Sequence, residues 1–88
     1  MLIIATKSPF IRALPQSDTG ATLLLSQDSV IAVTATLQAD HFVKVYALES
    51  DLAARGLTKT AQQNPMIEII NLQQFVQLTI NHHPIMNW

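Results

Sequence analysis

Hydrophobic residues along the chain gather in four short runs separated by polar and turn-forming residues. Each run has the length of a β-strand, and together they predict strands at Leu2–Ala5, Ala21–Leu25, Phe42–Ala47 and Met66–Ile70. The first two runs are almost continuously apolar, as in strands that are buried on both faces of a sheet. The third run alternates and places Lys44 and Tyr46 on one face, so we expect that face to be less completely covered.

Two segments between these strands carry helical signals. Ser8–Leu14 begins with a serine cap and a proline at the first helical position, and Pro15 ends it after about two turns. Gln27–Leu37 is rich in β-branched residues, which would also suit a strand. We predict a helix there because Ser26 can cap it, Asp28 favours its first turn, and parallel strands need a crossover.

The clearest helix of the chain begins at Asn71. Asn71 and Gln74 form a capping-box pattern, and Ile70 can pack on Phe75 as a hydrophobic staple. Apolar residues then recur at helical spacing until Asn81, where the following His-His-Pro sequence ends the helix.

The alternation of strands with short helices predicts an α/β fold. The length of 88 residues is enough for one domain, so we expect a single three-layer α/β/α domain over residues 1–88, with a mostly parallel sheet of four to five strands. The composition is 49% hydrophobic and only 12% charged, where a typical domain carries about 25% charge. Part of this apolar excess therefore indicates a subunit interface.

Charge and cysteine content argue against several classes of function. The net charge is −1, and the five Lys and Arg residues are scattered, without the basic stripe that binding to a phosphate backbone requires. No apolar run approaches the ~20 residues of a membrane span, and no basic region precedes the apolar start as in a secretory signal. We therefore expect a cytoplasmic protein with no direct nucleic-acid or membrane partner. The cysteine count of zero removes thiolate metal ligands and cysteine nucleophiles.

Acidic and basic residues come together directly after the third predicted strand, in the sequence ESDLAARG. Loops at the carboxyl ends of strands often hold the active sites of α/β enzymes, so one interpretation is a small enzyme that uses Asp28, Glu49, Asp51 and Arg55. The same segment also describes a short helix, with Ser50 as its cap, acidic residues in the first turn, a cation in the last and Gly56 just beyond. We favour the helix, because no histidine or nucleophile accompanies the acids.

Other polar residues give weaker signals. Gln27 and Asp28 follow the second strand and either begin a helix or contact a substrate or partner. His82 and His83 are adjacent and diverge in direction, which makes them a poor chelate, and we expect neither a metal nor another cofactor. We expect the indole of Trp88 to pack on the core of the domain or on a partner.

Three stretches of the chain closely resemble the TusB/DsrH family of small sulfur-relay subunits, with the TusB branch as the better fit. They are KVYALESDLAARGLT from Lys44 onward, LLLSQDSVIAV before it and FVQLTINHHPIMNW after it, and the opening KSPF matches as well. The resemblance covers nearly the whole chain, and its most specific part is the strand that runs into Asp-Leu-x-Ala-Arg-Gly. It implies the DsrEFH-like form of the fold predicted above.

The resemblance implies partners of a particular kind. TusB-like chains assemble with TusC-like and TusD-like subunits of the same fold into a heterohexamer. That complex receives persulfide sulfur from a TusA-like carrier and passes it toward a TusE-like protein, for 2-thiouridine formation at the wobble position of tRNA.

The resemblance also implies where the reactive sulfur lies. The transfer cysteine belongs to the TusD-like subunit, and DsrH-like members often carry a cysteine between their first two strands. This chain has none between Phe10 and Gly20, and a persulfide needs a thiol sulfur. We therefore expect a non-catalytic partner subunit.

Four residues are the expected partner contacts: Gln27, Asp28, Tyr46 and Trp88. A third interpretation, beside the relay subunit and the carboxylate enzyme, is a stand-alone homo-oligomeric module. Self-association of the isolated chain would not exclude the relay subunit, because related folds can pair with themselves when their partners are missing.

Overall fold

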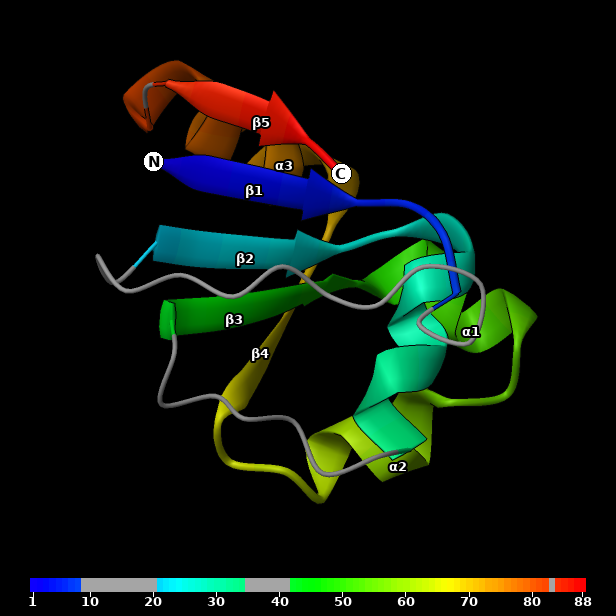
Figure 1. Ribbon diagram of the computed structural model, residues 1–88. Coiled ribbons are helices and arrows are strands. Elements are labelled where there is room, and N and C mark those ends of the chain that lie inside the picture. The colour runs from blue at the N-terminus through cyan, green and yellow to red at the C-terminus, as the bar shows by residue number, and fades with distance from the viewer. Residues whose placement is uncertain (9–20, 35–41, 83) are drawn as a thin grey trace.

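The computed structural model describes residues 1–8, 21–34, 42–82 and 84–88, and within them five strands form one sheet. The order across the sheet is β4-β3-β2-β1-β5, and every neighbouring pair is parallel (Figure 1). The prediction of an α/β fold with a parallel sheet is therefore confirmed. The strands are β1 (Leu2–Ala5), β2 (Ala21–Leu25), β3 (Phe42–Leu48), β4 (Ile67–Ile70) and β5 (Ile85–Asn87).

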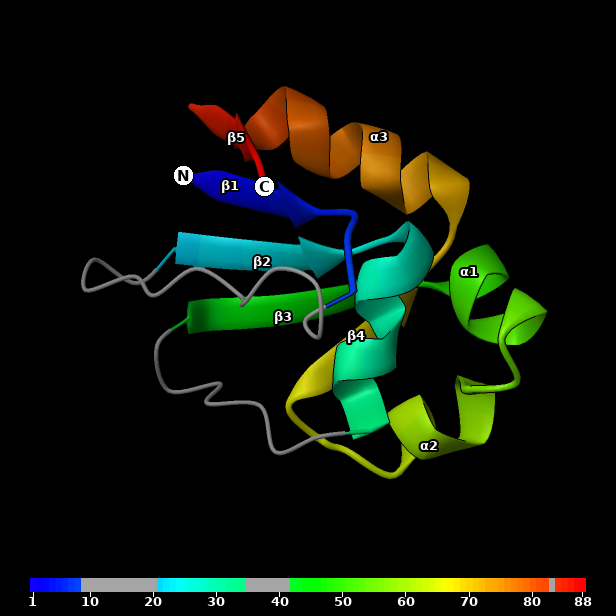
Figure 2. The ribbon, with the colours of Figure 1, turned by 45° about the vertical axis from the view of Figure 1, so that its right-hand side comes forward.

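Within the described residues, four helices cover the two faces of this sheet. Three of them, η1, α1 and α2, contribute buried residues to one face, and α3 packs on the other (Figure 2). A parallel sheet needs such crossovers, because each strand must begin again at the same edge. The helices are η1 (Gln27–Thr34, a 3-10 helix), α1 (Glu49–Ala54), α2 (Thr58–Gln62) and α3 (Leu72–Asn81).

The core is divided by the sheet into a larger and a smaller cluster. Along β1, Ile3 and Ala5 face the larger cluster, under η1, whereas Leu2 and Ile4 face the smaller one, under α3. Every residue of β1 and of β2 is buried, as the two continuous apolar runs predicted. The smaller cluster consists of Leu2, Ile4, Leu24 and Ile70, with Tyr46, Phe75 and Leu78 packed against it.

The carbonyl of Ala5 joins the end of β1 to the start of η1. It accepts hydrogen bonds from the Ser26 backbone N–H at 3.0 Å, from the Ser26 hydroxyl at 3.0 Å and from the Ser29 hydroxyl at 2.7 Å. Ser26 directly precedes η1, the position predicted for its cap, and its hydroxyl donates to Ala5, so a capping bond from this hydroxyl stays a prediction. The predicted helix is a 3-10 helix that reaches Thr34, and residues 35–37 lie outside the described residues.

Helix α1 is the short helix that the sequence predicted, with a different start. It begins at Glu49 after Leu48, so Ser50 lies inside the helix and the prediction that it caps α1 was wrong. Arg55 follows the last turn, and Gly56 has the left-handed φ of 65°. The N–H of Gly56 reaches the Ala53 carbonyl and that of Leu57 reaches Leu52, which is the Schellman pattern at a helix end.

Helix α3 begins as predicted. The Asn71 side chain accepts from the Gln74 N–H at 2.9 Å, and the Gln74 side chain accepts from the Asn71 N–H at 2.9 Å, so the capping box is complete. Ile70 is buried, and Phe75 packs on the same cluster, in agreement with the predicted staple. The helix ends at Asn81.

Three further features of the described residues depart from the sequence prediction. Strand β5 and helix α2 were not anticipated. Strand β4 begins at Ile67, because the Met66 N–H bonds the Asn64 side chain in the turn before it. The predicted helix Ser8–Leu14 lies outside the described residues beyond Ser8.

The capping box gives a direct test of the fold. Asn71→Ala removes the side chain that satisfies the Gln74 N–H, and we expect the free energy of unfolding to fall by about 1 kcal/mol in urea denaturation. Asn81→Ala at the exposed far end of α3 is the matched control and should cause no loss, since alanine favours a helix. Equal losses in both variants would contradict the role of the cap.

Candidate functional site

A group of charged side chains joins η1 to α1 at the carboxyl edge of the sheet. Arg55 Nη2 lies 2.8 Å from Asp28 Oδ1, and Arg55 Nη1 lies 3.7 Å from Asp51 Oδ1. Asp51 Oδ2 also accepts a hydrogen bond of 2.8 Å from the backbone N–H of Gln27. Two of the predicted contact residues, Gln27 and Asp28, thus lie beside two residues of the predicted carboxylate enzyme.

Gln27 carries backbone strain at the centre of this group. Its φ is 52°, a left-handed conformation that is uncommon for residues with a side chain. The Asp51 carboxylate fixes this turn by accepting the Gln27 N–H, and the side chain of Gln27 is exposed. The Gln27 turn therefore lies at the contact between the start of η1 and α1.

The contacts of this group describe a structural link between helices. The Arg55 guanidinium pairs with both carboxylates, and the Asp51 carboxylate holds a backbone N–H. Glu49, the fourth residue of the enzyme hypothesis, is exposed and takes part in none of these contacts. The structure thus brings Asp28, Asp51 and Arg55 together and leaves Glu49 apart.

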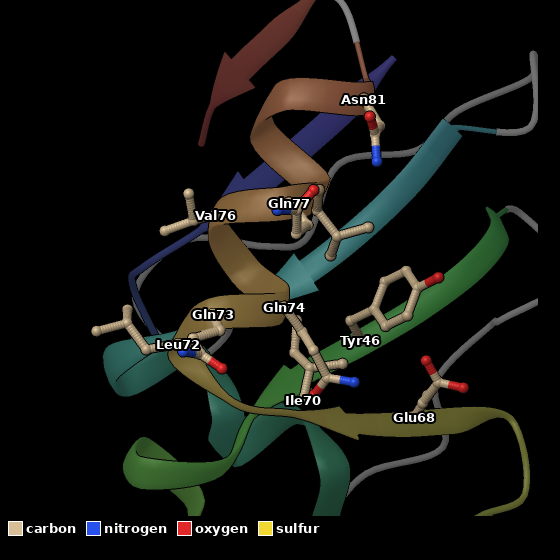
Figure 3. Close-up of a pocket in the computed structure, with 10 residues that line it drawn as sticks. Tyr46, Glu68, Ile70, Leu72, Gln73, Gln74, Val76, Gln77 and Asn81 are labelled. Carbon is tan, nitrogen blue, oxygen red and sulfur yellow. The ribbon is translucent and has the colours of Figure 1, made fainter.

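Tyr46 lies in a separate place, on the α3 face of the sheet. It forms part of an open groove of about 740 Å³, whose floor includes Tyr46, Glu68 and Ile70 and whose wall is α3. Figure 3 shows Tyr46 and Glu68 rising from neighbouring strands beside the helix that carries Asn81.

Lys44 contacts two residues of this groove. Its ammonium lies 5.7 Å from the centre of the Tyr46 ring and 3.7 Å from Glu68 Oε1, so the charges at this edge of the sheet largely balance each other. The prediction that the third strand is less completely covered on the Lys44 and Tyr46 side agrees with the partial exposure of both residues.

Trp88 packs on the domain itself. Its backbone N–H donates to the Ile4 carbonyl at 2.8 Å, and its half-buried side chain packs against the larger core cluster. Of the two placements expected for this indole, the structure shows the first. Contact of Gln27, Asp28, Tyr46 or Trp88 with a partner stays a prediction.

Sequence reasoning missed a surface without charge formed by α3 and β5. The last charged residue of the chain is Glu68, and none occurs from Ile69 to Trp88. Leu72 and Val76 also line the Tyr46 groove, and both side chains are exposed. The gap in charge was visible in the sequence, but the exposure of its apolar residues was not. Those exposed by more than a third are Leu72, Val76, Ile80, Ile85 and Met86.

The described residues also limit other kinds of site. Among them no group of three or more potential metal ligands gathers. No helix in the described ranges combines the length and the apolarity that crossing a bilayer demands.

The fold and its surfaces define a small parallel α/β protein with an ion-paired group after β2 and β3 and with exposed apolar residues on α3 and β5. Comparison with known proteins identifies the family. The family model described as "DsrH like protein" matches residues 6–85, so the chain belongs to the TusB/DsrH family. This agrees with the resemblance carried by the segment after β3.

Curated relatives bear the name Protein TusB. The protein of Escherichia coli strain K12 is 40% identical over 77 residues, covering 78% of this chain and 76% of the relative. That of Pectobacterium carotovorum is 37% identical over 76 residues, covering 81% and 78%. That of Serratia proteamaculans is 36% identical over an alignment of 97 positions that covers both chains completely.

The strained turn at Gln27 yields a stability prediction. Glycine adopts a left-handed φ without steric cost, so Gln27→Gly should raise the free energy of unfolding by about 0.5–1 kcal/mol. Thermal and urea unfolding of the isolated chain measure the change.

The control is Gln63→Gly. Gln63 ends α2 with a φ of −76°, where glycine brings no relief of strain and adds entropy to the unfolded chain. It should leave stability unchanged or reduce it. A loss of stability in Gln27→Gly as well would show that the Gln27 backbone is not strained.

Proposed function

We propose that this chain is a non-catalytic subunit of a TusBCD-like sulfur-relay complex that supports 2-thiouridine formation at the tRNA wobble position. Its partners would be TusC-like and TusD-like subunits, with TusA-like and TusE-like carriers reached through the complex. The main support for this proposal is the match to the DsrH-like family over residues 6–85, together with relatives named Protein TusB.

The chemistry of the chain supports an accessory role. Persulfide transfer requires a thiolate, and the 88 residues contain no cysteine. The charged residues that converge after β2 and β3 are engaged in ion pairs and a backbone hydrogen bond, which suits a link between helices. In this proposal the reactive sulfur lies on a partner, and this chain acts in the cytoplasm through protein contacts.

The surface of the chain supports assembly. Charged residues make up 12% of the sequence, and apolar side chains are exposed on α3 and β5. A charge-poor surface with exposed apolar residues is the composition of an interface core. A small domain also gains stability when a partner covers such residues.

Co-expression tests the proposal directly. The chain is produced with the TusC-like and TusD-like proteins of the same organism, with the affinity tag on the TusD-like protein. We expect all three to elute together at equal stoichiometry. With a persulfide donor, sulfur label should appear on the TusD-like protein and not on this chain. A chain that stays behind when the other two elute together would overturn the proposal.

Tyr46 provides a residue-level test of partner contact. Tyrosines at the centre of interfaces often contribute 2 kcal/mol or more, so Tyr46→Glu should weaken binding to the TusC-like and TusD-like pair by about tenfold or more. Lys59→Glu, on the exposed surface of α2, is the control and should bind normally. Titration by calorimetry gives both affinities, and equal affinities would remove Tyr46 from the interface.

A further inference from the structure

The outer edge of β5 is open to pairing with another strand. Pro84 accepts from the Leu2 N–H and Trp88 donates to the Ile4 carbonyl, so these residues direct their backbone groups to β1. Backbone direction alternates along a strand. The N–H and C=O groups of Ile85 and Asn87 therefore point outward, and among the described residues no strand lies beyond β5.

This edge strand is short, with three residues, but it lacks several other features with which proteins usually prevent edge pairing. Those features are charged residues, proline and bulges, and β5 consists of isoleucine, methionine and asparagine in regular register with β1. The opposite edge of the sheet differs, because β4 carries Glu68 in an ion pair with Lys44. Ile85 is 38% exposed and Met86 is 39% exposed, and no residue after Glu68 is charged.

We propose that the outer edge of β5 pairs with β5 of a second copy of this chain, antiparallel, about a two-fold axis beside Met86. In this arrangement Ile85 of each chain exchanges two hydrogen bonds with Asn87 of the other, which satisfies all the outward backbone groups of both strands. Met86 then faces Met86 of the second copy as a pair without hydrogen bonds, with Cα atoms about 4.5 Å apart. The two sheets become one.

The pairing strand belongs to a second copy of this chain because the edge of β5 is complementary to itself. A two-fold axis at Met86 puts like residues opposite each other, which is costly for charged residues and harmless for the uncharged residues of β5 and α3. The alternation of backbone groups is symmetric about Met86, so both copies are satisfied in the same register. This pairing is independent of the proposed relay function, because it uses the isolated chain and no sulfur carrier.

Charged substitutions of Met86 test whether the two-fold axis of the dimer lies beside this residue. The wild-type chain should sediment at twice its 9.7 kDa mass at concentrations of tens of micromolar. Met86→Lys and Met86→Glu each put like charges opposite one another, so each variant alone should dissociate at least tenfold more readily. An equal mixture of the two should recover the dimer as a heterodimer. Met66→Lys is the control, because Met66 is 54% exposed before the other edge strand, and it should remain dimeric.

A cysteine variant tests the same contact without adding charge. The chain contains no cysteine, so Met86→Cys introduces the only thiol. The expected Cα separation lies within the range that a disulfide spans, and mild oxidation should cross-link most of the protein as a dimer. Met66→Cys should cross-link several-fold more slowly.

Three results would overturn the pairing. They are a monomeric wild-type chain at these concentrations, charged variants that stay dimeric when tested singly, and equal cross-linking rates for the two cysteine variants. A failure here leaves co-elution with the TusC-like and TusD-like proteins unaffected, so the two proposals are judged separately.

Discussion

Burial of β1 and β2 on both faces is the constraint from which the rest of this structure follows. Two adjacent parallel strands without a solvent-facing side need helices above and below them, and parallel pairing requires crossovers that can supply those helices. The helices cover the two faces of the sheet to different extents. Helix η1 places Val30 and Val33 fully or almost fully out of solvent, while α3 buries none of its residues completely. On the weakly covered face, Leu72, Val76 and Ile80 of α3 therefore stay exposed.

The junction between β1 and η1 depends on a single acceptor. A buried carbonyl must be satisfied, and that of Ala5 accepts from one backbone and two side-chain donors, all from Ser26 and Ser29. Ser26 and Ser29 thus tie the start of η1 to β1. Gln27, which lies between them, has a left-handed φ, and its N–H donates to the Asp51 carboxylate. The charged group at the carboxyl edge therefore lies beside the junction between β1 and η1.

The sequence was most informative where local chemistry decides the structure. The limits of β1 and β2 and the capping box of α3 follow from continuous apolar runs and from residues three positions apart. Strand β5 has only three residues and owes its conformation to pairing with β1. No periodic pattern in the sequence therefore predicts it. The contact between Asp28 and Arg55 joins residues far apart in the chain, and its geometry depends on the crossover lengths. Ser50 has the right residue type for a cap, but α1 begins one residue before it.

The pairing of β1 with β5 has a consequence for the way the chain folds. Leu2 and Ile85 are register partners although nearly the entire sequence separates them, and contacts of such long range close large loops and slow the search for the native state. A growing chain holds β1 with one side unpaired until β5 has been made. During synthesis the most hydrophobic strand pair of the protein thus has a temporary edge, and chaperones or early association with another chain would protect it.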